Sequence, residues 1–162
     1  MNSAIERLLA LRVGDAMTKE VVRLSPQESM AAAAEILVDH HITGAPVVDG
    51  NDCCVGVLSA TDFVREFRTQ CEQRSASPAI NLGIATNGRS DIDIVGTKPN
   101  LVAEHMTSPV RSVAEDTTLL DATRAMCDRH VHRMLVLDDR GRLRGVLSAL
   151  DVLTAVIQAV EE

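Results

Sequence analysis

The chain contains an internal repeat. Residues 13–64 and 102–153 align without a gap at a constant step of 89 residues, the separation of Met17 from Met106. About 15 of roughly 50 aligned positions are identical, including Met-Thr near the start of each copy and Gly-Val-Leu-Ser-Ala-x-Asp near its end. One structural unit therefore occurs twice, and the fold has to be built from two similar halves.

Each copy shows the same order of predicted elements. Short strands at 21–24 and 110–113 are each followed by a helix, for which Ser29 or Thr118 supplies the capping hydroxyl. Apolar residues spaced i, i+3, i+7 predict a buried stripe on each helix, namely Met30, Ala33 and Leu37 in the first copy and Leu119, Ala122 and Met126 in the second.

Two further strands and a final helix complete each copy. The strands are joined by turns at 50–52 and 139–141, which predicts a hairpin, and the last helix begins at Ser59 or Ser148. The expected fold class is α/β, with two βαββα repeats related by a pseudo-two-fold axis. Both final helices carry apolar residues on more than one face, which predicts a homodimer.

The repeats divide the chain into four regions. We expect an N-terminal amphipathic helix over 1–12, repeat 1 over 13–68, a linker over 69–100 and repeat 2 over 101–162. Polar and turn-forming residues dominate 69–100, so an extended linker is predicted there, with a lid over a pocket as the alternative.

Composition excludes several classes of protein. The net charge is −7 and only Phe63 and Phe67 are aromatic, which argues against a nucleic-acid partner. There is neither a signal pattern nor a run of roughly 20 apolar residues, so membrane insertion is not expected. None of the four cysteines belongs to a CxxC pair, which predicts reduced thiols and a cytoplasmic location.

Two groups of polar residues are candidates for ligand binding. Ser59 with Asp62, and Ser148 with Asp151, place a carboxylate at the head of a helix, where it can accept hydrogen bonds from vicinal hydroxyls. The same Ser-x-x-Asp pattern is also a capping box, and both interpretations stay open. The pair formed by residues 132 and 133, His-Arg, can contact phosphate, or can be a solvated helix end.

With these motifs in place, the chain resembles a tandem pair of CBS domains, also called a Bateman module. The resemblance rests on Met-Thr, the capped helix, Pro-Val-Val-Asp and Gly-Val-Leu-Ser-Ala-x-Asp in a fixed order, with close counterparts in the second copy. It implies a regulatory sensor without catalysis that binds AMP, ADP, ATP or S-adenosylmethionine between its repeats. It also implies a homodimer and an effector protein on another chain.

The resemblance further implies two clefts, in each of which the carboxylate of one repeat faces strands of the other. In the first cleft, repeat 1 contributes Ser59, Thr61 and Asp62. Repeat 2 contributes Val110, Arg111, Val131, His132 and Arg133. The second combines Ser148 and Asp151 with Val21, Val22, Ile42 and Thr43. Because Gly44 stands where repeat 2 has Arg133, we expect the second cleft to bind charged nucleotides more weakly.

Other functions receive less support from the residues. The histidines at 40–41 and at 130 and 132 lack further ligands at a recognisable spacing, so no metal site is predicted. The chain has no Gly-rich phosphate loop, nucleophile elbow or HExxH motif, and no enzyme is expected. Two alternatives stay open: a ligand-independent dimerisation or partner-docking module, and a metal-linked or redox-responsive regulator.

Overall fold

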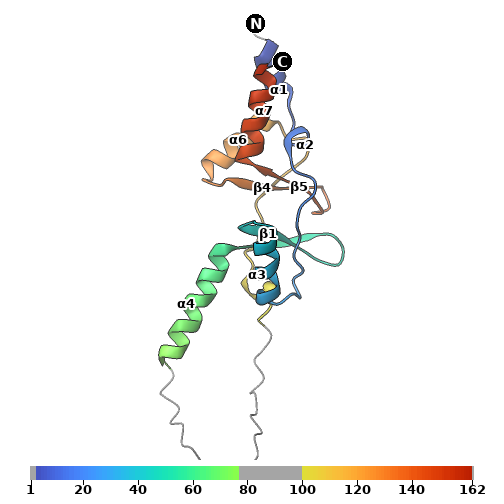
Figure 1. Ribbon diagram of the computed structural model, residues 1–162. Coiled ribbons are helices and arrows are strands. Elements are labelled where there is room, and N and C mark those ends of the chain that lie inside the picture. Colours follow the sequence, from blue (N-terminus) through green and yellow to red (C-terminus); the bar gives the residue numbers. More distant parts are fainter. Residues whose placement is uncertain (1–2, 77–99, 162) are drawn as a thin grey trace, which may run out of the picture.

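The computed structural model describes residues 3–76 and 100–161 (Figure 1). The first half contains α1 (Ser3–Ala10), α2 (Val13–Ala16), α3 (Met30–Asp39), β1 (Gly44–Val48), β2 (Cys54–Ser59) and α4 (Ala60–Ala76). The second half contains α5 (Val102–His105), β3 (Ser112–Val113), α6 (Leu119–Asp128), β4 (Arg133–Leu137), β5 (Leu143–Ser148) and α7 (Ala149–Glu161). Two similar α/β units follow one another along the chain, which confirms the predicted fold class.

The local predictions for α3 and α6 are confirmed. Ser29 caps α3 by accepting a hydrogen bond from the Ala32 amide (3.1 Å), and Thr118 caps α6 by accepting one from the Asp121 amide (3.1 Å). These bonds satisfy amide groups that the first turn of a helix leaves without partners. All six residues of the two predicted stripes are at most 5% exposed: Met30, Ala33, Leu37, Leu119, Ala122 and Met126.

The two sheets differ by one strand because of a proline. In repeat 2, β3 runs parallel to β4, and the Leu135 amide donates to the Arg111 carbonyl (3.4 Å). The equivalent position in repeat 1 is Pro46, which has no amide hydrogen to donate. The strand predicted at 21–24 is therefore reduced to a single bridge between Leu24 and Val47, and repeat 1 keeps a two-stranded sheet.

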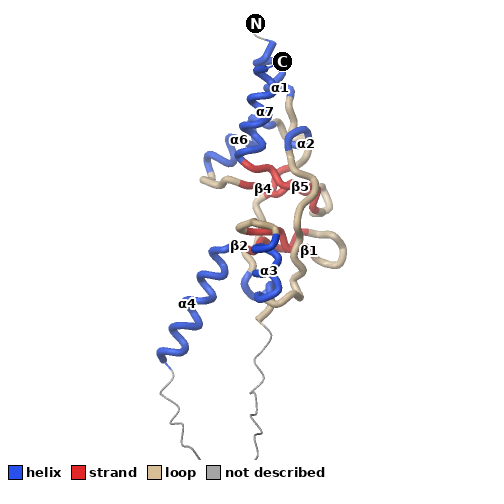
Figure 2. The backbone as a smooth tube through the Cα atoms, in the orientation of Figure 1, coloured by secondary structure: helices blue, strands red, loops and turns tan. Residues whose placement is uncertain are grey.

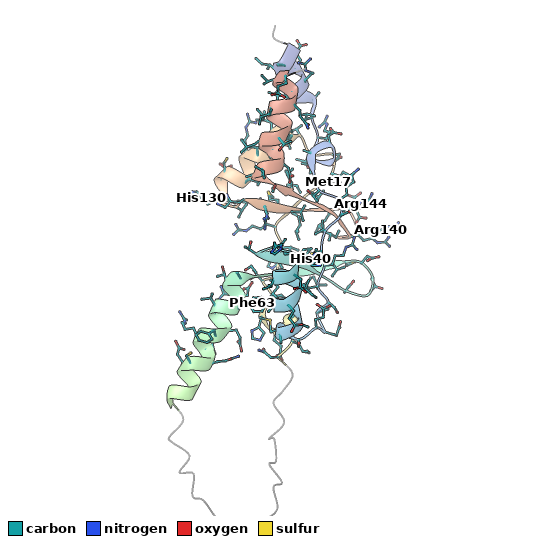
Figure 3. The ribbon with its side chains drawn as sticks, viewed as in Figure 1. Met17, His40, Phe63, His130, Arg140 and Arg144 are labelled. Carbon is teal, nitrogen blue, oxygen red and sulfur yellow. The ribbon has the colours of Figure 1, made fainter. Side chains whose placement is uncertain are left out.

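Each repeat sends its first segment into the core of the other. We call residues 12–18 and 101–107 the exchanged segments. Val13 and Met17 pack in the core around α6 and β4, whereas Val102 and Met106 pack against the core around α3 and β1. Figure 1 accordingly shows α2 beside β5 and α7, and Figure 3 places Met17 against the sheet of repeat 2.

Backbone hydrogen bonds fix this exchange symmetrically. Thr18 and Val146 exchange two bonds of 2.9 Å, and Thr107 and Val57 exchange bonds of 2.8 and 3.1 Å. Both pairs relate residues that are equivalent in the two repeats. The repeats are thus related by a pseudo-two-fold axis and interlocked, so neither can complete its core alone.

The two sheets face each other across the middle of the molecule, with helices at both ends (Figure 2). Val48, Leu135 and Leu143 form the buried centre of their contact. The hairpin turns also meet, because the Cys54 amide donates to the Gly141 carbonyl (2.9 Å). This arrangement leaves the opposite ends of the two hairpins free to line a shared site.

Helices α1 and α4 frame the two ends of the molecule. α1 packs on α7, where the Arg7 guanidinium donates to the Ala159 carbonyl (3.0 and 3.3 Å), while Ile5 and Leu9 stay exposed. α4 continues to Ala76, so residues 69–76, expected in the linker, are helical. Their Gln, Glu and Arg are good helix formers, and no Gly or Pro interrupts them. Residues 77–99 of the predicted linker, and with them the lid alternative, lie outside the described residues.

Candidate functional site

A cavity of about 850 Å³ lies between the two repeats. We call it the inter-repeat cavity. It takes its walls from the ends of both hairpins and from the segment before β3, with the lining residues Thr43, Gly44, Ala45, Pro46, Val57, Ser59, Thr107, Pro109, Val110, Arg111, Val131, His132, Arg133, Met134, Leu135, Val146, Ser148, Ala149 and Leu150. Its volume lies within the roughly 300–1,000 Å³ that is usual for small-molecule sites.

The hairpin register explains why both repeats contribute. Gly44 pairs with Ser59 at one end of the β1–β2 hairpin, and Arg133 pairs with Ser148 at the same end of the β4–β5 hairpin. The pseudo-two-fold axis brings these two ends face to face. Thr43 and Ser148, which were predicted for the second cleft, therefore line the same cavity as residues predicted for the first.

The charged side chains of the lining are cationic. Arg111 and Arg133 line the cavity together with His132, and no Asp or Glu belongs to the lining. Arg133 donates to the Thr43 hydroxyl (3.4 Å), and Arg111 donates to the Arg129 carbonyl (3.5 Å), so both contacts are with neutral oxygens. On a chain whose net charge is −7, this local excess of positive charge favours an anionic ligand.

The rest of the wall is mainly aliphatic. Apolar side chains come from strands of both repeats and from the segments before β3 and β4, among them Val57, Val110, Val131, Leu135 and Val146. Such a surface can pack against a flat heterocycle by dispersion and by exclusion of water. The cavity thus combines an apolar wall with two guanidinium groups.

Asp62 lies behind this wall rather than in it. The side chain is 4% exposed, and its Oδ2 accepts hydrogen bonds from the amide and the hydroxyl of Ser59 (both 2.8 Å). Its Oδ1 accepts from Arg65 (2.9 Å) and from the Thr107 hydroxyl (3.3 Å). The capping interpretation of Ser59 and Asp62 therefore describes this geometry. Ser59 and Thr107 themselves line the cavity, and their oxygens keep free acceptor capacity.

Ser148 and Asp151 form the equivalent pair at the start of α7. Asp151 Oδ2 accepts from the amide and the hydroxyl of Ser148 (both 2.7 Å). Ser148 lines the inter-repeat cavity, whereas Asp151 lines a second hollow of about 570 Å³ between α1, α2 and α7. Asp151 therefore contacts Ser148, with which it was grouped in the sequence, but lies outside the cavity that Ser148 shares with Thr43.

The predicted site residues divide into two groups. Eight line the inter-repeat cavity: Thr43, Ser59, Val110, Arg111, Val131, His132, Arg133 and Ser148. Six lie outside its lining: Val21, Val22, Ile42, Thr61, Asp62 and Asp151. Val21 and Ile42 are both half-buried, Val21 between the sheets and Ile42 against the core of repeat 1. Thr61 is exposed on α4.

Sequence reasoning missed Thr107 and Leu150. The identity of Thr107 with Thr18 in the alignment of the repeats could have marked it as a candidate site residue. Its contact with Asp62, however, depends on the exchange of segments. Leu150 stands where repeat 1 has Thr61. It lines the cavity although its side chain is 71% exposed, which places it at the rim.

Among the other His and Cys residues, His41 and His130 stand in turns and Cys54 is half-buried. His41 and His130 both adopt φ of 53° at the ends of α3 and α6, the left-handed turn that often ends a helix. Within residues 3–76 and 100–161, no three potential metal-binding side chains cluster. Burial raises the pKa of the Cys54 thiol, which disfavours the reactive thiolate there. No helix in these ranges is long and apolar enough to cross a bilayer.

Comparison with known proteins identifies the family. The model of the CBS domain matches residues 13–69 and 102–158. Because these matches cover more than half of the chain, the chain belongs to the CBS domain family, as a pair of such domains. The resemblance inferred from the repeated motifs is confirmed.

Two curated relatives show the extent of the similarity. The chloroplastic CBS domain-containing protein CBSX2 of Arabidopsis thaliana is 31% identical over 156 residues, which cover 93% of this chain and 65% of that protein. An uncharacterized protein of Methanocaldococcus jannaschii is 30% identical over 146 residues, which cover 90% of this chain and 40% of that protein. The chain spans less than two thirds of the length of both relatives.

Solved structures show the same fold. The crystal structure of CBSX2 in complex with AMP superposes with a TM-score of 0.71 at 28% identity, covering 94% of this chain and 99% of that one. A CBS domain pair crystallised with 5′-methylthioadenosine and S-adenosyl-L-methionine superposes with a TM-score of 0.67 at 19% identity, covering 94% and 99%. The second likeness concerns the fold alone.

Proposed function

We propose that the protein is a regulatory module that binds an adenine nucleotide in the inter-repeat cavity. The observation that carries this proposal is the cavity itself, whose lining contains Arg111 and Arg133 but no carboxylate. A phosphate group would bind the two guanidinium groups, since their planar donors match phosphate oxygens. His132 adds a further donor in the same lining. The likeness to CBSX2 in complex with AMP supports this choice of ligand.

The sugar would bind the hydroxyl groups of the lining. Ser59 and Thr107 direct their protons to Asp62, so their oxygens act as acceptors toward the cavity. Ribose hydroxyls are donors and would complete these hydrogen bonds. In this arrangement Asp62 acts through Ser59 and Thr107, and Asp151 acts in the same way through Ser148. The base would pack on aliphatic residues such as Val110 and Val131.

The module would regulate without catalysis. A ligand that contacts both repeats changes the free energy of their association, and this change can be transmitted to an effector protein. We also propose a homodimer that forms through the outward faces of α4 and α7, where Val64, Phe67, Leu150, Leu153 and Ile157 are each more than half exposed. We also propose a cytoplasmic location, in which Cys53, Cys54, Cys71 and Cys127, which form no disulfide, would stay reduced.

These exposed faces favour one second candidate, a module that dimerises or docks a partner without a ligand. A thermal-shift screen with AMP, ADP, ATP, S-adenosylmethionine and adenosine separates the two. A ligand that binds only the folded state raises the melting temperature with concentration. The nucleotide proposal expects such a rise for at least one phosphorylated compound. If no compound raises the melting temperature, the ligand-independent docking module is the better account of the protein.

A further inference from the structure

The second hollow, of about 570 Å³, lies between α1, α2 and α7 and shares no lining residue with the inter-repeat cavity. We call it the α7 hollow. Figure 1 shows the three helices together at the end of the molecule away from α4. The volume is within the usual range for small-molecule sites. Its polar lining comprises five side chains, namely Arg7, Asp15, Asp151, Thr154 and Gln158.

The corresponding place in repeat 1 holds larger side chains. There α5 packs on α4 as α2 packs on α7 in repeat 2. Glu66 Oε2 lies 3.2 Å from His105 Nδ1, and both side chains are 19% exposed. The α7 hollow thus lies where repeat 1 carries bulkier polar groups. The replacements, from repeat 1 to repeat 2, are Arg65 by Thr154, Glu66 by Ala155 and His105 by Ala16.

Repeat 1 also shows what its carboxylate binds at this place. Arg65 Nη1 donates to Asp62 Oδ1 over 2.9 Å, while Asp62 Oδ2 accepts from the amide and the hydroxyl of Ser59. One oxygen of the carboxylate therefore caps the helix, and the other binds a guanidinium group. This second contact is charge-assisted and is the stronger kind of hydrogen bond.

Asp151 keeps only the first half of this arrangement. Its Oδ2 accepts from the amide and the hydroxyl of Ser148. Among residues 3–76 and 100–161, no group donates to its Oδ1, because Thr154 stands in the place of Arg65. The Thr154 hydroxyl donates instead to the Leu150 carbonyl (3.0 Å). The carboxylate of Asp151 is thus left with an open oxygen beside a hollow.

We propose that the α7 hollow binds a small molecule carrying a guanidinium group, which donates to Asp151 Oδ1 as Arg65 donates to Asp62. The ligand supplies to repeat 2 the group that repeat 1 carries in its own chain. This is a second binding site, and it goes beyond the proposed nucleotide function without depending on it.

The charges of the hollow fit such a ligand. Asp15 and Asp151 both line it, and the net charge of −7 attracts cations to the chain. The guanidinium of Arg7 donates through Nε and Nη2 to the Ala159 carbonyl (3.3 and 3.0 Å). Ala159 lies eight residues along α7 from Asp151, a rise of about 12 Å, so Arg7 occupies the other end of the hollow.

These two ends make L-arginine a suitable probe. Its guanidinium would contact Asp151, and its carboxylate would lie toward Arg7, whose Nη1 is not used in the contact with Ala159. Citrulline is the matched compound, because it keeps the shape of arginine and replaces the guanidinium by a neutral group. Titration calorimetry on the full chain should find saturable binding of arginine. We expect citrulline to bind about tenfold more weakly or less, as for the loss of a hydrogen bond to a charged group.

Thr154→Arg gives repeat 2 the residue of repeat 1. The new guanidinium should occupy Asp151 and reduce the arginine affinity by about tenfold or more. Thr69→Arg is the matched control. Thr69 is likewise an exposed residue of a final helix whose hydroxyl donates to the carbonyl four residues earlier (3.1 Å), but it lies outside the hollow. This control should bind arginine as the wild type does, and thermal unfolding checks the fold of both variants.

The possible failures are distinct. Absence of saturable arginine binding to the wild type, or equal affinities for arginine and citrulline, would refute the guanidinium site. An unchanged affinity in Thr154→Arg would show that arginine binds elsewhere on the chain. Because the two cavities share no lining residue, a failure of AMP to bind would refute the proposed function and leave this site standing.

Discussion

The Thr107 hydroxyl donates to Asp62 Oδ1 over 3.3 Å, a hydrogen bond between the two repeats. Thr107 lies on one of the exchanged segments and Asp62 lies at the head of α4. The contact holds the Thr107 side chain at the wall of the inter-repeat cavity, with its oxygen available to a ligand. The exchange of segments therefore builds part of the candidate site.

Thr107→Val tests this contact, because valine keeps the shape and removes the hydroxyl. We expect AMP binding to weaken by about 1 kcal/mol, the usual net value of one hydrogen bond. Thr18→Val is the matched control, since Thr18 makes the equivalent backbone pair but does not line the cavity. Calorimetry that finds the same affinity for both variants would remove Thr107 from the site.

Asp62→Ala should affect both stability and binding. The substitution leaves the Ser59 and Arg65 donors without their acceptor, so we expect the unfolding free energy to fall by about 1.5–3 kcal/mol, as for hydrogen bonds to a charged group. AMP binding should weaken less, by about 1 kcal/mol, because Asp62 would act on the ligand only through Ser59 and Thr107. Asp151→Ala should have a smaller effect on AMP, because Asp151 accepts from Ser148 but not from a second lining residue. Urea unfolding separates the loss of stability from the loss of affinity. Equal losses of affinity in the two variants would contradict this asymmetry.

The exchange itself is tested by Gly145→Ala. A Cβ at Gly145 would lie 2.7 Å from the Thr18 carbonyl oxygen and 2.8 Å from Met17 Sδ. Overpacking of this kind costs about 1–3 kcal/mol of unfolding free energy. Gly56→Ala should cost less, because the three atoms nearest to its Cβ all belong to the flexible side chain of Met106 and none to the backbone. Gly50→Ala, with nothing within 4 Å, is the control and should be nearly neutral in a denaturant titration.

Asp138 should make the fold sensitive to acid. The backbone N–H of Arg142 donates to Asp138 Oδ1 (2.9 Å) and, with the N–H of Arg140 and the positive charges of Arg142 and Arg144, lowers the pKa of this carboxyl. Because the folded-state pKa is lowered, the stabilisation is complete above the ordinary aspartate pKa of about 3.9. It is lost as the pH falls below that value through the lowered pKa.

Asp138→Asn removes the titrating group. Melting temperatures measured from neutral to acidic pH should fall less steeply for this variant than for the wild type. Asp139→Asn, which changes the neighbouring exposed charge, should retain the wild-type slope. An unchanged slope in Asp138→Asn would show that this turn does not contribute to acid sensitivity.

The parts of the fold that depend on neighbouring residues could be predicted from the sequence. Ser29 and Thr118 cap their helices as expected, and the apolar stripes of α3 and α6 are buried, because capping and helical periodicity are local properties. The exchange of segments could not be predicted in this way. Val13 and Val102 are the same residue at equivalent positions, so either core accepts either valine.

In the candidate site, too, the local features could be predicted from the sequence and the long-range contacts could not. Arg111, His132 and Arg133 line the cavity as expected, since they stand beside or within strands whose ends were predicted. Asp62 was expected to face the ligand, but Ser59 and Thr107 lie between it and the cavity, and Thr107 comes from a segment 45 residues away in the chain. The missing strand of repeat 1 had a local signal in Pro46, whose lack of an amide hydrogen ends the parallel ladder.

The guanidinium of Arg133 should discriminate AMP from adenosine. Arg133→Ala should weaken AMP and leave adenosine almost unchanged, with a loss that shrinks as salt is added, because exposed charge contacts are screened. Arg140→Ala is the control, since Arg140 is also exposed but lies on the turn at the other end of the β4–β5 hairpin (Figure 3).

Titration calorimetry of AMP and adenosine into the wild-type chain and the Arg133→Ala variant tests the central claim most directly. We expect saturable binding of AMP that is tighter than that of adenosine in the wild type, and a difference that is much reduced in the variant. Absence of AMP binding to the wild type, or equal affinities for AMP and adenosine, would contradict a cavity that recognises nucleotides through its cationic wall.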